Sequence, residues 1–188
     1  MGTWTSPSPT GTTGSVSSGT ISAGKGAGSG CGSGARIGRG LIDLVRGGTI
    51  TLVNVHGSSG EASSDIDCRT QQVDQVFVDV GDGDPAANGV LDLIQGDFNT
   101  DPRSAVALVL DASARRWADF VGAGKPFAFV NEYVKTYPRN APAFAIDNVV
   151  SNVLTGTCWH PGVTSGHPAV SPEGYFDHTP TVCTITVP

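Results

Sequence analysis

The sequence predicts an α/β domain with at least one mixed sheet, and two observations support this prediction. Strand-like and helix-like hydrophobic patterns alternate along the chain from about residue 40 to its end. The chain has 188 residues, of which 38% are hydrophobic, and this is enough to form the core of one domain.

The first 36 residues differ in composition from the rest. They consist largely of Ser, Thr and Gly and contain almost no aliphatic residues. Such a segment buries too little apolar surface to offset the entropy that is lost on ordering. We therefore expect a loop or a disordered segment over residues 1–36 and a folded domain over residues 37–188.

The first predicted elements are a hairpin, a helix and a strand. Residues 40–45 and 49–55 have strand patterns and are separated by the glycine-rich turn 46–48. Over residues 64–80, apolar residues recur at helical spacing with acids and glutamines between them, which predicts an amphipathic helix. Residues 90–95 predict a buried strand that leads straight into a polar loop.

The second half predicts one short helix and two strands. Residues 111–122 form the helix, with Asp111 as its N-cap and Gly122 at its C-terminal end. Residues 144–153 and 181–187 alternate like strands. The segment between these two strands is predicted as a long loop and contains three of the four histidines.

The charge balance limits the partners that the sequence favours. The net charge is −6 and the pI is about 4.9. An acidic surface attracts a nucleic-acid backbone only through a local basic patch or a bridging cation. No apolar run approaches the ~20 residues of a membrane span, and the first residues lack the regions of a signal peptide.

The cysteines predict two disulfides. They are Cys31, Cys68, Cys158 and Cys183, and no two of them form the Cys-x-x-Cys pair that is common in zinc sites. Their order along the chain favours pairing the first with the second and the third with the fourth, although other connectivities are possible. Disulfides imply an exported, extracellular protein. The alternative is a cytosolic protein with four reduced thiols.

Four groups of polar residues lie at or just beyond the ends of predicted strands. They are Asn54-Val55-His56, Asp97-Phe98-Asn99, Asp147 and Asp177-His178. A rigid sheet can hold such side chains in convergent positions. Carboxylates hold Mg²⁺ and orient water, histidines move protons, and an amide can bind a phosphate oxygen. These residue types therefore suit the hydrolysis of a phosphate ester.

Each group also has a structural explanation. Asp97 and Asn99 would form an Asx turn after a strand, and His56 would be a half-buried histidine with satisfied hydrogen bonds. Asp177 and His178 would be a chance pair in a polar loop. Asp147 favours the functional interpretation, because a carboxylate inside an apolar strand needs a partner such as a histidine.

The order of these groups resembles the endonuclease/exonuclease/phosphatase superfamily of metal-dependent phosphoesterases. The matching motifs are NVH (54–56), GDFN (96–99), AID (145–147) and DHTP (177–180), with Arg69 and Gln72 on the helix between the first two. The resemblance covers roughly residues 37–187, and GDFN is its most specific motif. It implies a DNase I-like fold, which is a two-sheet, four-layer α/β sandwich.

The resemblance also implies roles for individual residues. Asp97 would orient or activate the attacking water, and Asn99 would bind the scissile phosphate. His178 would act as general base or as a donor to the transition state, and Asp147 would hold its tautomer. His56 would donate to a phosphate oxygen or assist the leaving group.

The implied cofactor is Mg²⁺ or Mn²⁺, held by Asp177, Asp97 and Asn99. The family also uses a metal-binding glutamate that precedes the Asn-x-His motif, whereas Glu61, Glu132 and Glu173 all follow His56. The chain therefore resembles the C-terminal part of such a domain, and the resemblance does not include most of the N-terminal half. We expect weak metal binding and weak or no activity.

A sheet without its partner sheet is expected to expose an apolar face. The residues of this face include Leu52, Val53, Leu91, Leu93, Ile94 and Val149. Exposed apolar patches promote association, so we expect either self-association or aggregation through this face, or coverage of the face by the Gly/Ser-rich N-terminal segment.

Three functions are compatible with the sequence. The first is a secreted, metal-dependent phosphodiesterase or nuclease-type hydrolase, with nucleic acid as a possible substrate. The second is a non-catalytic binding module on the same scaffold. The third is a sphingomyelinase-like lipid phosphodiesterase, which would share the motifs and differ in its surface loops.

Overall fold

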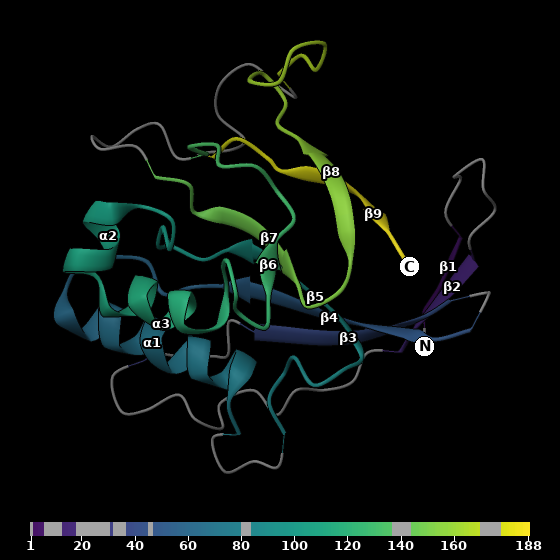
Figure 1. The fold of residues 1–188 in the computed structure, drawn as a ribbon, viewed down its shortest axis with the longest axis horizontal. Helices are drawn as coiled ribbons and strands as arrows, with labels where there is room; N and C mark the ends of the chain where they lie inside the picture. Colours follow the sequence, from purple (N-terminus) through teal and green to yellow (C-terminus); the bar gives the residue numbers. More distant parts are fainter. Residues whose placement is uncertain are drawn as a thin grey trace.

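The computed structural model describes two sheets, with helices against one face of the larger one (Figure 1). The described residues are 2–5, 13–17, 31, 37–44, 47–79, 84–136, 144–169 and 178–188, with the backbone alone for the first two ranges. The larger sheet has the strand order β1-β2-β3-β4-β5-β7-β6, and the smaller one pairs β8 with β9. The predicted α/β class with a mixed sheet is confirmed.

The larger sheet contains one parallel pair, β4 with β5, among antiparallel neighbours. Its strands are β1 (Gly2–Thr5), β2 (Thr13–Ser17), β3 (Ile37–Asp43), β4 (Thr49–His56), β5 (Leu91–Asp97), β6 (Ala128–Phe129) and β7 (Asp147–Ser151). The predicted hairpin is the pair β3–β4. A parallel pair needs a long crossover, and the helix α1 (Ser63–Phe77) lies in the connection from β4 to β5.

Three helices form a layer on one face of this sheet (Figure 1). They are α1, α2 (Ala105–Leu110) and α3 (Ala112–Phe120). Asp111 caps α3 by accepting a hydrogen bond from the backbone of Ser113 (2.8 Å), as the sequence predicts. The buried core between this layer and the sheet includes Ile37, Val53, Val55, Val73, Val76, Ile94, Phe98, Trp117 and Val150.

The smaller sheet covers the other face. Its strands are β8 (Thr155–Trp159) and β9 (Val182–Thr186), which pair antiparallel. A second buried cluster forms there from Ile50, Leu93, Val149 and Leu154, with Cys183 and Ile185 among the partly buried residues packed against it.

This covering corrects the expected exposure of an apolar face. Val53 and Ile94 are buried in the core on the helix side, and Leu93 and Val149 are buried in the second cluster. Leu52 and Leu91 are partly buried against that cluster. The missing layer is supplied by β8, which lies in the segment predicted as loop, together with β9. Self-association through this face therefore has no support from the described residues.

Both disulfides have the favoured pairing, Cys31 with Cys68 and Cys158 with Cys183. The first bond joins a residue ahead of β3 to the buried side of α1. The second joins directly opposed residues of β8 and β9. Their presence is compatible with an extracellular protein.

Several elements differ from the sequence-based prediction. β1 and β2 lie within residues 1–36, which were expected to be loop or disordered. Strands can form there because backbone pairing at a sheet edge requires no aliphatic side chains. The predicted helix 64–80 ends at Phe77. The elements α2, β6 and β8 were not predicted. Among the described helices, none has the length and apolar character needed to cross a bilayer.

The aromatic contact between α3 and the loop after β5 generates a stability prediction. Trp117 is 1% exposed, and its ring stacks on Phe98 with 3.8 Å between the centroids. Trp117→Ala should lower the free energy of unfolding by about 3–5 kcal/mol, because it opens a large cavity in the core. Urea unfolding measures this loss. The matched control is Trp159→Ala at a half-buried position, and an equal loss in both variants would contradict the assignment of Trp117 to the core.

Candidate active site

Three neighbouring strands bring polar residues to one edge of the larger sheet. β4 ends at His56, β5 ends at Asp97 and β7 begins at Asp147. The register pairs His56 with Asp97 across β4 and β5, and Asp97 with Asp147 across β5 and β7. The three residues therefore form one row on the sheet.

His178 completes this row from the segment before β9. Its Nδ1 lies 3.2 Å from Asp147 Oδ2 and 3.8 Å from Asp97 Oδ2. On the other side, His56 Nε2 lies 3.9 Å from Asp97 Oδ2. The His56 side chain is 61% exposed, whereas the other three are 17–20% exposed. The cluster thus opens to solvent at His56.

Asn99 lies against the same carboxylate. Its backbone N–H donates to Asp97 Oδ1 (2.7 Å), which is the Asx turn that the structural explanation predicts. Its amide Nδ2 donates to Asp97 Oδ2 (2.9 Å) and to the Gly57 carbonyl (3.0 Å). Asn99 has φ of 50°, and these bonds hold it in the left-handed region. The turn and the candidate site are therefore the same structure.

Two glycines let the chain segments around Asp97 approach closely. Gly96 has φ of 135°, and a Cβ there would overlap the Val55 carbonyl. A Cβ on Gly57 would overlap the Phe98 carbonyl. Larger residues would separate β4 from β5 at the point where His56 and Asp97 meet.

Other residues of the loop after β5 fix it to the rest of the domain. The Phe98 ring stacks on Trp117, and the Phe98 N–H donates to the Ile146 carbonyl (2.8 Å). Asp101 is 1% exposed and accepts hydrogen bonds from the Ala145 N–H (3.0 Å) and the Tyr133 hydroxyl (2.9 Å). These contacts hold the segment immediately ahead of Asp147.

Thr136 connects the two partners of the Asp–His pair. It is fully buried, and its hydroxyl accepts a hydrogen bond from the Asp147 N–H (3.1 Å). Its carbonyl accepts one from the Thr179 N–H (2.9 Å), next to His178. Thr136 therefore fixes the backbones of both segments.

Arg69 and Gln72 of α1 hold the loop that follows His56. Arg69 is 4% exposed, and its Nη1 donates to the carbonyls of Ser58 and Gly60 (2.7 Å each). Its Nη2 lies 3.1 Å from Asp111 Oδ2. Gln72 accepts a hydrogen bond from the Ser58 N–H (2.9 Å). The two residues that match the family helix are thus placed to shape the loop.

Burial and a neighbouring acid control the charge of Asp97. Burial raises the pKa of Asp97, and the negative charge of Asp147 raises it further. The Asn99 backbone N–H, His178 and His56 act in the opposite direction, but the net shift is upward. A carboxyl with a raised pKa is a stronger base than an exposed one.

The remaining sequence candidates lie elsewhere. Asp177 falls outside the described residues. His167, which was assigned to a loop, stacks on Trp159 with centroids 4.1 Å apart. His160 was also assigned to a loop, but it is 2% exposed and lies against Thr181. The local sequence carries no signal for its burial, because the apolar residues Cys158 and Trp159 precede it without strand-like alternation.

The raised pKa of Asp97 generates a prediction about pH and stability. The stabilising effect of this carboxyl is complete below its unfolded pKa of about 3.9 and is lost as the pH rises through the folded pKa. In EDTA, the free energy of unfolding of the natural protein should therefore fall relative to that of Asp97→Asn as the pH rises above about 4. Urea unfolding at a series of pH values measures the difference, and parallel profiles would show that the shift is absent.

The comparisons with known proteins concern the fold. No protein-family model matches the sequence, and no curated protein matches it. An endonuclease/exonuclease/phosphatase from Beutenbergia cavernae DSM 12333 matches with a TM-score of 0.55 at 14% identity, over 92% of this chain and 44% of that chain. Beta toxin 275-280 from Staphylococcus aureus matches with a TM-score of 0.50 at 14% identity, over 79% and 56%.

The chain therefore spans about half the length of these two structures. At such low identity the likeness concerns the arrangement of helices and strands. The chain has the DNase I-like fold of endonuclease/exonuclease/phosphatase proteins.

Proposed function

We propose that this protein is a metal-dependent phosphodiesterase of the nuclease type. The observation that carries the proposal is the cluster of Asp97, Asp147 and His178, whose ligand atoms lie within 4.8 Å of one another beside the exposed His56. Two partly buried carboxylates this close repel each other, so the arrangement favours a functional role over a purely structural one.

Each residue of the site has its own role in the proposed reaction. Asp97 orients the attacking water and accepts its proton, which its raised pKa favours. His178, held by Asp147, donates a hydrogen bond to the phosphoryl oxygen on which charge develops, and Asn99, whose amide donates to Asp97 and to the Gly57 carbonyl, holds the Asp97 carboxylate in place. The bond from phosphorus to the water oxygen forms while the bond to the alcohol oxygen breaks. His56 returns a proton to the departing alcohol.

The residues present fit a divalent cation. Asp97 and Asn99 supply the oxygen ligands that Mg²⁺ and Mn²⁺ prefer. Apart from the approach of His178, Asp147 Oδ2 is buried without a hydrogen-bond partner among the described residues. A bound cation would supply positive charge to the phosphate oxygens. Asp177 belongs to the proposed ligand set by its sequence position.

The proposal extends to phosphodiesters as a class, with a nucleic acid or a sphingomyelinase-like lipid as candidate substrates. Two of the described arginines, Arg69 and Arg103, donate hydrogen bonds inside the domain, so neither of them contributes to a basic surface. The two disulfides favour secretion. A non-catalytic binding module is the second candidate, because Asp97 and Asn99 also form an Asx turn, which needs no catalytic role.

Hydrolysis of bis-p-nitrophenyl phosphate with Mg²⁺ or Mn²⁺ tests the proposal. We expect a weak, metal-dependent rate that falls at least about 100-fold in His178→Ala, which removes the imidazole, and in Asp147→Asn, which removes the carboxylate that orients it. The control is His167→Ala, which removes a histidine that stacks on Trp159 and should keep the rate. A metal-independent rate that is equal in all four proteins would favour the binding module.

Calorimetric titration with Mg²⁺ or Mn²⁺ tests the metal site separately. Two carboxylates and one amide supply little charge, so we expect a dissociation constant of about 1 mM or weaker. Asp97→Asn should abolish this binding, whereas Asp119→Asn at an exposed position on α3 should not change it. Submillimolar binding at one site that survives Asp97→Asn would place the metal elsewhere.

A further inference from the structure

His160 is a buried histidine in the segment that the sequence predicts as loop. Its side chain is 2% exposed, and it follows directly on β8. Strand alternation places Cys158 and His160 on the inner side of the smaller sheet and Trp159 on the outer side. A buried imidazole costs free energy unless it has polar partners, so its contacts indicate what it does.

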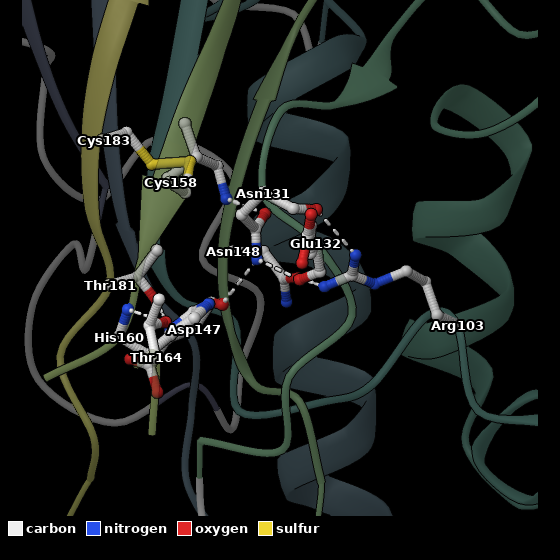
Figure 2. The surroundings of a disulfide bond; sticks show 11 residues. Arg103, Asn131, Glu132, Asp147, Asn148, Cys158, His160, Thr164, Thr181 and Cys183 are labelled. Carbon is white, nitrogen blue, oxygen red and sulfur yellow. Dashed lines mark hydrogen bonds between the residues drawn. A yellow bond between two sulfur atoms is a disulfide. The ribbon is translucent and has the colours of Figure 1, made fainter. Parts of the chain in front are cut away.

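His160 joins the turn after β8 to the segment before β9. Its backbone N–H donates to Thr164 Oγ1 (2.9 Å), and its carbonyl accepts from the Thr164 N–H (2.8 Å). Its ring Nδ1 lies 3.2 Å from Thr181 Oγ1. Figure 2 shows His160 together with Thr164 and Thr181 near the bond between Cys158 and Cys183.

The ring has one polar side-chain contact in the described part of the chain, and that contact is Thr181. The Pro180 carbonyl is near the ring, but Nε2 has no partner that meets hydrogen-bond geometry. Burial lowers the pKa of His160, against the opposing effects of the Pro180 carbonyl, Asp147 and Glu132. The neutral ring therefore faces the Thr181 hydroxyl.

The position of Thr181 matters because it lies three residues after His178. The strand that follows, β9, pairs with β8 and with no other described strand, and a two-stranded sheet is only marginally stable by itself. On the β7 side, the segment is fixed by the bond from Thr179 to Thr136. On the β8 side, the contact of His160 with Thr181 lies nearer to His178 in sequence than the disulfide does.

We propose that His160 is a positioning residue, which fixes residues 180–181 against β8 so that the His178 ring faces Asp147. The ring of His160 does not touch the reacting atoms in this assignment. Its effect on His178 follows from the contacts alone, whereas its effect on the rate rests on the proposed function.

NMR of the His178 ring in the oxidised, full-length protein tests the positioning directly. Long-range ¹H–¹⁵N spectra report which ring nitrogen carries the proton and whether the ring has one environment. Thr181→Val removes the hydroxyl at nearly constant volume, and His160→Phe removes the ring nitrogens. In both variants we expect His178 to lose its single tautomer pattern.

Two further variants sharpen the test. His160→Asn keeps a polar atom near the position of Nδ1, so His178 should keep the single tautomer pattern of the natural protein. His167→Asn removes the other histidine of the same loop and should leave the pattern unchanged. If His160→Phe fails to fold, Thr181→Val alone decides. An unchanged His178 pattern in folded Thr181→Val would overturn the proposal.

Kinetics separate this proposal from the proposed function. If the protein is a phosphodiesterase, Thr181→Val should lower kcat roughly 10-fold to 100-fold with little change in KM, because misplaced catalytic groups affect the chemical step. No activity in any protein, together with an altered His178 pattern, would reject the function and keep the positioning role. Full activity of Thr181→Val with an unaltered pattern would reject the positioning role and keep the function.

Discussion

The pairing register of β4 with β5 and of β5 with β7 is the constraint on which the site depends. It places His56, Asp97 and Asp147 side by side at one edge of the sheet. The same register buries Val53 and Ile94 against the helices. A slip of one residue would move every side chain to the opposite face. The apolar core therefore stabilises the alignment of His56, Asp97 and Asp147, because its residues lie on the same paired strands.

The residues next to the polar row explain how two partly buried acids are tolerated so close together. Phe98 and Asp101 fix the loop after β5 to the helix layer and to the segment ahead of Asp147, and Arg69 fixes the loop after His56. Each of these contacts fixes backbone on one side of the site. The repulsion between Asp97 and Asp147 is thus resisted by hydrogen bonds and aromatic packing that lie outside the cluster.

Strong local patterns made much of the fold predictable from the sequence. The hairpin, α1, β5 and α3 have clear hydrophobic periodicity or caps, and strand ends marked the residues that the sheet brings together. The strand β8 was missed because its inner side carries Gly156 and Cys158 in place of aliphatic residues, and α2 because its apolar run lacks helical periodicity. The role of His160 depends on Thr181, which is distant in sequence, so no local pattern could reveal it.

The bond between Cys158 and Cys183 closes a covalent loop of the chain, and this loop contains both His160 and His178. The two cysteines are 25 positions apart in sequence. In an oxidised but unfolded chain, this loop already limits the distance between the two histidines, so part of the loop-closure entropy is lost before folding begins. When the segment opens locally, the tether keeps it close to the strand that it must rejoin, and recovery of the native arrangement requires only a short diffusive search.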